Sequence, residues 1–355
     1  MRIAQVAPLY ESVPPKAYGG TERVVSYLTE ELIDMGHEVT LFASGDSVTR
    51  ARLIPACPES LRLSTSCVDQ LARHIAMLEL VFSRKHLFDI IHFHIDYLHF
   101  PISRREAAVQ VTTLHGRLDI PDLQPIYQTY GHMPVISISD AQRGPISWAN
   151  WQGTVYHGLP KERYDFQGCP GQYLAFLGRV SPEKGLDQAI AIATSAGLPL
   201  KIAAKIDRAD QDYFENRIKP LLDHPLVEFI GEIGYPDKSD FLGKALALLF
   251  PINWPEPFGL VMIEAMACGS PVIAYPYGSV PEIIEDGVTG ILVRDVAEAV
   301  RAIDKIEKID RAACRARFEE RFSATRMAKD YVNIYERLIR KEPDLIAFAD
   351  GVSVG

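Results

Sequence analysis

Two glutamates flank the start of an apolar helical segment in the sequence P-E-P-F-G-L-V-M-I-E-A-M-A, which begins at Pro255. A proline restricts the residue before it, so Glu256 is expected in a turn ahead of the helix. We predict that the helix begins near Phe258. Its first backbone N–H groups, from Phe258 to Val261, have no partner within the helix, and together with the helix dipole they favour a phosphate.

Glu264 is the only charged residue in the apolar stretch L-V-M-I-E-A-M-A. A carboxylate that leaves water needs a hydrogen-bonding partner, and the hydroxyls of a sugar or of a ribose would provide one. The plainer alternative is that Glu256 is a solvated turn residue and Glu264 a salt-bridged helical residue. The two glutamates alone leave both interpretations open.

A second motif, L-G-R-V-S-P-E-K-G, follows an apolar run that predicts a buried parallel strand at Tyr173–Leu177, and it precedes a helix from about Leu186. Cations at the C-terminal end of such a strand point into the ligand crevice. Arg179 can bind two phosphate oxygens while Lys184 adds a point charge, so the pair would neutralise a departing diphosphate. Taken alone, the motif is better explained as a turn with two solvated cations.

A glycine pair, Gly19 and Gly20, lies between an opening strand at Arg2–Ala7 and a helix predicted at about Thr21–Met35. Glycines at a helix start leave its N-terminus open to a phosphate or a sugar, although a glycine pair before a helix is also a common turn. The pattern lacks the third glycine of G-x-G-x-x-G and the acidic residue that should follow. The dinucleotide-dehydrogenase fingerprint is therefore excluded.

A histidine, His115, follows the strand pattern V-Q-V-T-T-L and would face the same crevice. Its predicted role is left open between orienting a sugar and polarising an acceptor, and the alternative is a hydrogen-bonded histidine at a turn. The segment H-F-H-I-D places His92, His94 and Asp96 on one face of a strand, a spacing that would suit zinc in a hydrolase. Histidines at the end of a buried strand more often bond to backbone or acceptor groups. Metal-independent chemistry is favoured.

Together these motifs resemble glycosyltransferase family 4, the retaining transferases of the GT-B fold that move a sugar from a nucleotide-sugar donor. The resemblance covers nearly the whole chain, and its three motifs occur in the family's order. The matching residues are Glu256 and Glu264 for E-x7-E, Gly178, Arg179, Lys184 and Gly185 for G-R-x-x-x-x-K-G, and Gly19 and Gly20 for the N-terminal glycine loop.

The resemblance implies a role for each residue. Glu256 is expected to contact hydroxyls of the donor sugar and Glu264 the ribose, while Arg179 and Lys184 bind the diphosphate. It also assigns His115 to the reacting face near the donor sugar. The backbone amides expected on the phosphate and sugar are those of Phe258, Gly259, Leu260 and Val261.

Two departures from the family pattern concern the loops. His157-Gly158 replaces the Asn-Gly turn of many members, and Ala204-Lys205-Ile206 replaces a glycine-rich loop beside the nucleotide base. Lys205 would add a phosphate contact or alter the preference for the base. The base is therefore open, with UDP favoured only because it is frequent in the family.

The fold expected is α/β: a GT-B architecture of two Rossmann-like domains whose parallel sheets face a central cleft. Strand and helix patterns alternate along both halves of the chain. The predicted domains are 1–160 on the acceptor side, 161–322 for the nucleotide sugar, and a helix at 323–340 that crosses back to the first domain. The expected strands after the first are 38–43, 90–94, 109–114, 135–138, 154–156, 173–177, 200–204, 227–230, 247–250, 271–274 and 291–293.

Composition restricts the class of protein further. The chain has 355 residues, 37 basic and 46 acidic, for a net charge of −9, which argues against broad nucleic-acid binding. Its five cysteines show no C-x-x-C pair, and neither a targeting segment nor a membrane-spanning run is apparent, so a cytoplasmic location is expected. A modest basic edge at 73–86 leaves a peripheral membrane contact open. The oligomeric state is not set by the sequence.

The sequence thus predicts a retaining, metal-independent glycosyltransferase without a cofactor, which moves a hexose-type sugar from a nucleotide-diphosphate sugar, with UDP favoured. Its second partner would be a hydroxyl of a saccharide, lipid or small-molecule acceptor. The alternatives are a non-hydrolysing sugar-nucleotide epimerase and a non-catalytic GT-B module that binds a sugar nucleotide. An epimerase would need further acid and base groups near the sugar, and a silent module would lack the phosphate-binding cations.

Overall fold

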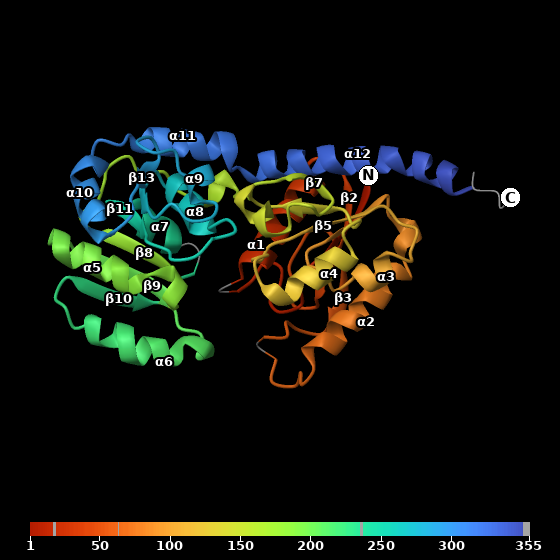
Figure 1. The fold of residues 1–355 in the computed structure, drawn as a ribbon, viewed down its shortest axis with the longest axis horizontal. Helices are drawn as coiled ribbons and strands as arrows, with labels where there is room; N and C mark the ends of the chain where they lie inside the picture. The colour runs from red at the N-terminus through yellow and green to blue at the C-terminus, as the bar shows by residue number, and fades with distance from the viewer. Residues whose placement is uncertain (17–18, 63, 235–236, 351–355) are drawn as a thin grey trace. The chain divides into compact units, whose positions relative to one another are not determined.

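The computed structural model describes residues 1–16, 19–62, 64–234 and 237–350, with side chains described through Arg340. The chain divides into two compact units (Figure 1). Unit 1 comprises Met1–Ile138, Arg143–Gly158 and the residues from Ala324 onward, and unit 2 comprises Ser139–Gln142 and Leu159–Ser323. The sequence placed the main boundaries at 160/161 and 322/323, and the units part at Gly158/Leu159 and Ser323/Ala324.

Unit 1 is built on a seven-stranded sheet in which all neighbouring strands are parallel. The strand order is β3-β2-β1-β4-β5-β6-β7. The strands are β1 (Arg2–Val6), β2 (Glu38–Ser44), β3 (Arg52–Cys57), β4 (Ile90–Phe93), β5 (Gln110–Thr113), β6 (Val135–Ser137) and β7 (Trp151–Thr154). The helices are α1 (Gly20–Asp34), α2 (Gln70–Phe82), α3 (Phe100–Ser103), α4 (Gln124–Thr129) and α12 (Ala324–Asp350).

Unit 2 repeats this plan with a six-stranded parallel sheet in the order β10-β9-β8-β11-β12-β13. Its strands are β8 (Leu174–Arg179), β9 (Leu200–Lys205), β10 (Val227–Gly231), β11 (Ala247–Phe250), β12 (Val272–Ala274) and β13 (Gly290–Leu292). Its helices are α5 (Leu186–Ala196), α6 (Gln211–Tyr213), α7 (Asp237–Gly243), α8 (Leu260–Ala267), α9 (Val280–Ile283), α10 (Val296–Ile306) and α11 (Arg311–Arg321).

Short 3₁₀ and π turns complete both units: η1 (Lys85–Leu87), η2 (Pro121–Leu123), η3 (Ala141–Ile146), η4 (Lys161–Arg163), η5 (Pro182–Lys184), η6 (Arg208–Asp210), η7 (Phe214–Ile218) and η8 (Lys219–Leu221). Each sheet is parallel because its strands are linked by crossovers that return the chain to the same end. The expected α/β architecture of two Rossmann-like domains, each with a parallel sheet, is therefore confirmed.

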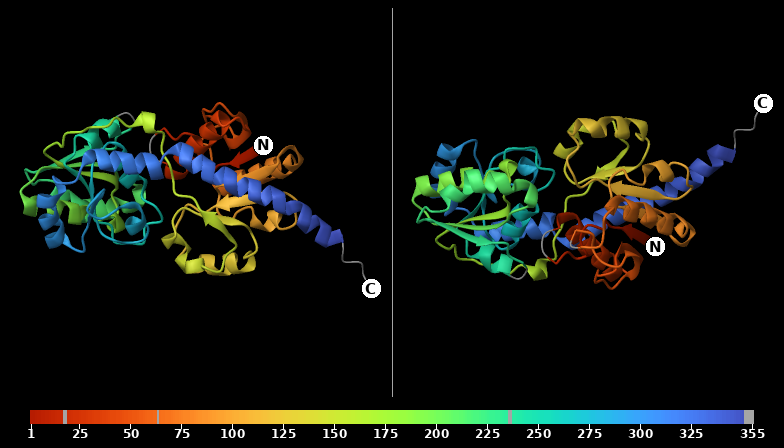
Figure 2. Two further views of the ribbon diagram at one scale, coloured as in Figure 1. Left: turned by 90° about the horizontal axis from the view of Figure 1, so that it is seen from above. Right: turned by 90° about the horizontal axis from the view of Figure 1, so that it is seen from below.

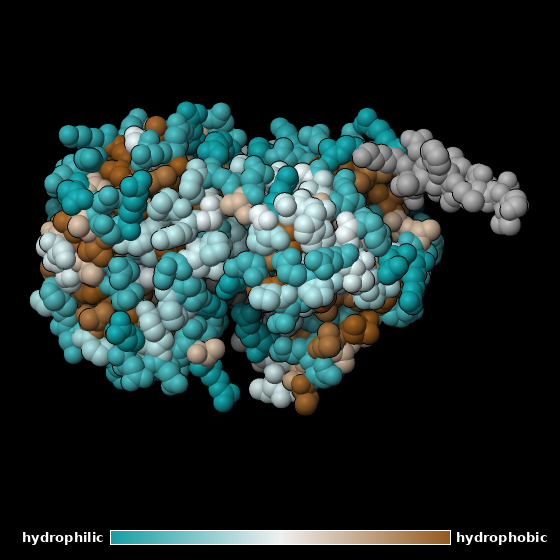
Figure 3. All heavy atoms as spheres, in the orientation of Figure 1, coloured by the Kyte–Doolittle hydropathy of each residue, from teal (hydrophilic) through white to brown (hydrophobic). Residues whose placement is uncertain are grey.

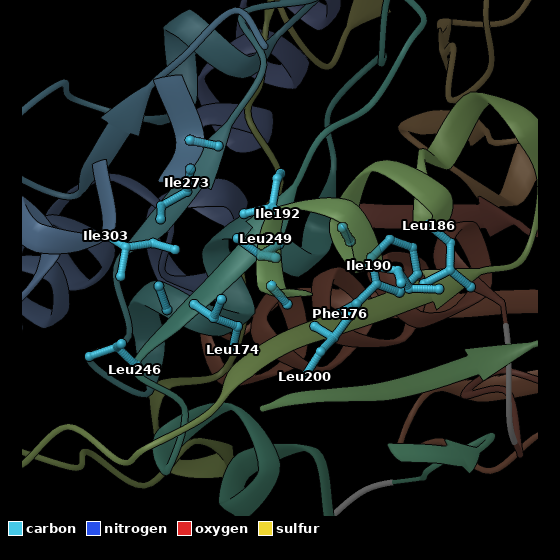
Figure 4. Close-up of a cluster of buried hydrophobic side chains, with 14 of the residues drawn as sticks. Leu174, Phe176, Leu186, Ile190, Ile192, Leu200, Leu246, Leu249, Ile273 and Ile303 are labelled. Carbon is cyan, nitrogen blue, oxygen red and sulfur yellow. The ribbon is translucent and has the colours of Figure 1, made fainter. Parts of the chain in front are cut away.

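The core of unit 2 lies between its sheet and the helices α5 and α10. Figure 4 shows Phe176 of β8, Ile190 of α5 and Leu249 of β11 in one cluster of buried side chains, to which Ile303 of α10 also belongs. Apolar residues succeed one another along β8 and β11 because a parallel strand is covered on both faces. Each fully buried side chain of this kind contributes about 1.5–3 kcal/mol to folding.

Helix α2 in unit 1 shows how the surface of the fold is patterned. Asp69 caps its N-terminus by accepting a hydrogen bond from the N–H of Ala72 at 3.0 Å, and Met77 and Val81 enter the core. On the outer side, Leu71 is 56% exposed. On the face drawn in Figure 3, hydrophilic residues predominate and hydrophobic ones lie between them. No helix in the described part of the chain is long and apolar enough to cross a membrane.

Helix α12 belongs to unit 1 although it follows the whole of unit 2 in sequence. It contacts α1, and Tyr331 and Tyr335 on α12 are completely buried. Figure 2 shows the helix running along the elements of unit 1 in both views. The helix expected at 323–340 is longer than predicted, because its backbone continues to Asp350.

Two edge strands of the first sheet were predicted poorly. β3 was missed, and its sequence R-L-I-P-A-C carries Pro55, which is tolerated because β3 lies at the edge of the sheet. The strand expected at 154–156 instead spans Trp151–Thr154, the other edge, where Gly153 weakens the strand pattern. The remaining strands were predicted to within a few residues, most easily where the run is buried, continuous and apolar, as in β11.

The buried Arg311 on α11 links this helix to the chain at Gln167 and to the chain around the end of α7, and its substitution tests how much this link stabilises unit 2. Its guanidinium donates to the carbonyl oxygens of Gln167 at 2.7 Å, Ala245 at 3.0 Å and Gly243 at 2.6 Å. Arg311→Ala would leave these carbonyls without that donor, so we expect a loss of about 3 kcal/mol or more in the free energy of unfolding, measured by denaturant titration. Arg301→Ala, at an exposed position on α10, should change it by less than about 0.5 kcal/mol. Equal effects of the two substitutions would contradict this assignment.

Candidate active site

An ion pair between Lys184 and Glu256 joins the two motifs that the sequence singled out. Lys184 Nζ lies 2.5 Å from Glu256 Oε2, and the two side chains are 17% and 10% exposed. Trp254 Nε1 donates to the same carboxylate oxygen at 2.9 Å, and the ammonium lies 4.9 Å from the centroid of the Trp254 ring. The pair is therefore held by an indole that sequence reasoning did not identify, although Trp254 stands only two positions before Glu256.

The loop that carries Lys184 is docked on the chain before Trp254. The N–H of Asn253 donates to the carbonyl oxygen of Glu183 at 2.9 Å. Gly185 has φ of 69°, and a Cβ there would lie 2.1 Å from the carbonyl oxygen of Pro251. Only glycine fits this close approach. The predicted need for a glycine at this position is explained by packing within unit 2.

The turn that carries Glu256 is supported by a loop that the sequence analysis missed. Gly278 has φ of 58°, and a Cβ there would lie 2.4 Å from the carbonyl oxygen of Glu256. Ser279 donates its N–H to the same carbonyl at 3.0 Å and its hydroxyl to the carbonyl of Phe258 at 2.8 Å. A glycine followed by serine just before a helix is the only signal in the sequence for this support.

The motif helix α8 begins at Leu260, not near Phe258 as predicted. Gly259 precedes it with φ of 82°, a left-handed conformation that prevents the helix from extending backwards. Leu260 and Val261 are half-buried, and their amides lie in the first turn, where N–H groups have no intrahelical partner. Phe258 is 2% exposed and lies outside the helix. The phosphate contact expected for the amides of Phe258, Gly259, Leu260 and Val261 stays a prediction, and of these residues only Leu260 and Val261 belong to the helix.

Arg179, at the end of β8, is surrounded by three carboxylates. Its guanidinium lies 2.5 Å from Glu183 Oε1, 3.8 Å from Asp207 Oδ2 and 3.5 Å from Asp210 Oδ2. Lys205 Nζ lies 3.0 Å from Asp207 Oδ1, so two cations and three anions leave a formal charge of −1. Burial raises the pKa of Asp210, with Glu183 and Asp207 adding to the effect and Arg179 opposing it. Arg179 thus already has anionic partners in the protein, and its expected contact with a diphosphate stays a prediction.

Glu264, on α8, has partners within the protein. The hydroxyl of Tyr164 donates to Glu264 Oε1 at 3.0 Å, and Lys238 Nζ lies 3.3 Å from the same oxygen. The glutamate is 3% exposed, so its desolvation is offset by these two contacts. Both contacts use one carboxylate oxygen. The expected contact with a ribose stays a prediction, and Tyr164 and Lys238 had no signal in the sequence.

The remaining predicted residues lie in unit 1. Gly20 is the first residue of α1, and a Cβ on Gly19 would lie 2.8 Å from Pro15 Cβ, so the turn before the helix is tight. His115 follows β5, and its Nε2 lies 2.9 Å from His94 Nδ1. Burial lowers the pKa of His115 to about 3, so its ring is neutral.

The zinc alternative at H-F-H-I-D is not supported by the side chains. The two ring nitrogens of His92 lie 2.6 Å from the hydroxyl of Tyr335 and 2.7 Å from that of Thr113. Those of His94 face His115 and Gln5. Within residues 1–16, 19–62, 64–234 and 237–340, no cluster of three or more His, Cys, Asp or Glu side chains is arranged to hold a metal.

The structure thus brings together part of the predicted set. In unit 2, Lys184 and Glu256 are in contact, and a Cβ on Gly259, just before α8, would lie 3.4 Å from Glu256 Cγ, while Arg179 and Glu264 have separate partners. In unit 1, His115 belongs to a network of buried neutral histidines, and Gly19 and Gly20 precede α1. The roles that the sequence assigned to these residues on a donor stay predictions.

Two family models match most of the chain. Residues 18–145 match "Glycosyltransferase Family 4", and residues 170–322 match "Glycosyl transferases group 1". An uncharacterized glycosyltransferase of Methanocaldococcus jannaschii is 25% identical over 95% of this chain and 98% of its own. Some curated relatives match over only about half of their own length, 46% in one case and 53% in another.

Solved structures agree with the fold. A glycosyltransferase involved in avilamycin A biosynthesis has a TM-score of 0.71 and 25% identity, covering 96% of this chain and 98% of its own. The Anabaena protein HepE, solved in complex with UDP-glucose, has a TM-score of 0.69 and 19% identity over 97% of this chain and 100% of its own.

The contact between Gly278 and Glu256 can be tested with a matched pair of glycines. Gly278 and Gly197 both have positive φ, but a Cβ on Gly197 would meet nothing within 4 Å. Gly197→Ala should cost about 1–2 kcal/mol of unfolding free energy for the left-handed backbone alone. Gly278→Ala should cost clearly more, because the new methyl group must displace Glu256. Denaturant titration of both variants measures the difference, and equal losses would show that the contact is unimportant.

The buried histidines of unit 1 should make the protein sensitive to acid. Burial holds the pKa of His92, His94, His99 and His157 well below 6.5 and lowers that of His115 to about 3. Unfolding therefore takes up protons, and stability present above pH 6.5 is lost as the pH falls toward 3. Each histidine contributes up to about 1.4 kcal/mol per pH unit in this window.

Asp96 opposes part of this effect, because burial raises its pKa to about 6 and its protonation favours the folded state. Urea titrations between pH 7.5 and 5 measure the slope. His99→Gln should reduce it by the contribution of one histidine, since His99 is bonded only to Ser103 and Thr112 hydroxyls among the described side chains. A stability independent of pH over this range would contradict the account.

Proposed function

The chain belongs to the family 4 glycosyltransferases of the GT-B fold, and from this premise we propose that it moves a hexose-type sugar from a nucleotide-diphosphate sugar to a hydroxyl of a saccharide, lipid or small-molecule acceptor. We propose further that the reaction retains the anomeric configuration and uses neither a metal nor another cofactor. The favoured nucleotide is UDP.

The observation that carries this proposal is the Lys184–Glu256 pair beside the first turn of α8. These residues are 72 positions apart in sequence, yet the ammonium and the carboxylate are in contact. A cation next to free helix amides suits the phosphate adjoining the sugar, and a carboxylate at the same place suits the sugar hydroxyls. One site thus offers partners for both sides of the bond that must break.

Leaving-group stabilisation supplies most of the catalysis in this proposal. As the bond between the anomeric carbon and the phosphate oxygen breaks, negative charge grows on the diphosphate and positive charge on the sugar. Lys184 and the amides of Leu260 and Val261 are already fixed in place by the loops at Gly185 and Gly259, so little reorganisation is needed. The acceptor hydroxyl attacks on the face that the diphosphate leaves and gives its proton to the departing phosphate oxygen.

Arg179 and Glu264 act on other parts of the donor. Arg179 exchanges its carboxylate partners for diphosphate oxygens, and Glu264 accepts hydrogen bonds from the ribose through the oxygen not used by Tyr164 and Lys238. His115 acts on the transferred sugar. UDP is favoured because it is frequent in the family and because HepE, which shares the fold, is solved with UDP-glucose.

A panel of UDP-, GDP- and ADP-hexoses tests the proposed function. The full chain is incubated with each donor, and thermal shift and nucleotide release with and without sugar acceptors are followed. A transferase raises nucleotide release when the right acceptor is present, and NMR of the product shows retention. An epimerase converts the donor without an acceptor, whereas a silent module shows a thermal shift and no turnover. Either of these results, or no binding of any donor, would contradict the proposal.

Removal of either cation should slow transfer strongly. By analogy with lost donors at a developing anion, Lys184→Ala and Arg179→Ala should each cost about 2.7–4 kcal/mol of transition-state stabilisation, or about 10²–10³ in kcat. The matched control is Lys219→Ala, which removes a lysine whose side chain is 60% exposed and paired with Glu215. Steady-state kinetics with the donor found in the panel measure the change. Equal rates for Lys184→Ala and Lys219→Ala would contradict the assignment of Lys184 to the diphosphate.

A further inference from the structure

A chain of hydrogen bonds leads from the first strand of unit 1 to His115. Gln5 on β1 and His94 after β4 are buried, and Gln5 Oε1 lies 2.8 Å from His94 Nε2. His94 Nδ1 in turn lies 2.9 Å from His115 Nε2. We call these three residues the Gln5–His94–His115 chain. Gln5 lies in the last part of β1, and His94 and His115 follow β4 and β5. All three residues therefore lie toward the C-terminal ends of neighbouring parallel strands.

The direction of the hydrogen bonds in this chain is set by the amide of Gln5. Its Nε2 donates to the hydroxyl of Tyr335 at 3.2 Å, which turns its oxygen toward His94. The hydroxyl of Tyr335 can then donate a hydrogen bond to His92 Nδ1 at 2.6 Å, and His92 Nε2 donates one to the hydroxyl of Thr113 at 2.7 Å. With the Gln5 amide in this orientation, each hydrogen bond from Gln5 through Tyr335 and His92 to Thr113 joins one donor to one acceptor.

The proton positions follow from the chemistry of neutral imidazole, which has one N–H and one acceptor nitrogen. Burial keeps both His94 and His115 neutral. Because the oxygen of Gln5 can only accept, His94 carries its proton on Nε2 and accepts at Nδ1. His115 must therefore donate from Nε2, which leaves its Nδ1 as an acceptor.

The Nδ1 atom of His115 is buried and has no hydrogen-bond partner among the described residues. A buried acceptor without a donor is costly, so the site is suited to a ligand that brings an O–H or N–H. A sugar hydroxyl meets this need, whereas a carboxylate or an ether oxygen does not.

We propose that Gln5 and His94 are positioning residues that fix the tautomer of His115, so that its Nδ1 accepts a hydrogen bond from a hydroxyl of the transferred sugar. The part that concerns the sugar rests on the proposed function. The part that concerns the tautomer rests on the protein alone. The enzyme then selects hexoses that carry a free hydroxyl at the position facing Nδ1.

The tautomer is measured by ¹⁵N NMR of the histidine side chains in the full chain. The expected result is a protonated Nε2 and an unprotonated Nδ1 on His115. Gln5→Met removes the amide oxygen and should convert His115 to a mixture of tautomers. Thr113→Val is the matched control, because it removes a buried hydroxyl from the branch through His92 and leaves the Gln5–His94–His115 chain intact. Protonated Nδ1 in the wild-type protein, or identical spectra for His115 in the two variants, would overturn the proposal.

The sugar contact is tested with wild-type protein and donor analogues, so it does not depend on the folding of a variant. In each analogue one hydroxyl of the donor hexose is replaced by hydrogen or by fluorine. Fluorine cannot donate a hydrogen bond, and neither can hydrogen on carbon. At the hydroxyl that faces His115 Nδ1, the fluoro and the deoxy analogue should therefore both bind about tenfold or more weakly than the donor, and to the same extent. Full affinity for every fluorinated analogue would overturn the sugar contact. If no sugar nucleotide binds at all, the proposed function fails, while the NMR result still decides the tautomer.

Discussion

The ion pair between Lys184 and Glu256 is the interaction on which the structure of unit 2 around the motifs depends. Both charges are largely removed from water, and such a pair is stable only when its geometry is good and its remaining hydrogen bonds are met. Trp254 supplies one of these bonds. Gly185 packs closely against the backbone of Pro251, and Gly278 against that of Glu256. A Cβ at either glycine would collide with these carbonyl oxygens, which explains why both residues are glycine. A cation and a carboxylate are thereby held beside the first amides of α8.

The two units present different chemistry at the residues singled out by sequence. In unit 2 the groups are charged, and Arg179 is paired with three carboxylates of the protein itself. In unit 1 the histidines are neutral, because burial lowers the pKa of His94 and His115. Their rings therefore offer hydrogen-bond donors and acceptors but no charge. We infer that the first arrangement suits a diphosphate and the second a sugar.

Much of the fold was predictable because parallel strands such as β8 and β11 are continuous apolar runs between helical patterns. The edge strand β3 was not, since Pro55 masks it and an edge is buried less. At the site, the sequence assigned Lys184 to the diphosphate and Glu256 to the sugar, but it did not predict that these two side chains form an ion pair. The support from Gly278, Tyr164 and Lys238 could not be predicted, because contacts between distant segments leave no periodic trace. A cytoplasmic location stays a prediction.

The most direct test of the central claim compares UDP with uridine as ligands of wild-type protein and of Lys184→Ala, with affinities measured by calorimetry. If Lys184 and the start of α8 bind the diphosphate, the substitution weakens UDP by about tenfold or more and leaves the affinity for uridine unchanged, because only UDP carries the phosphates. An equal loss for both ligands, or no loss for UDP, would show that the diphosphate binds elsewhere.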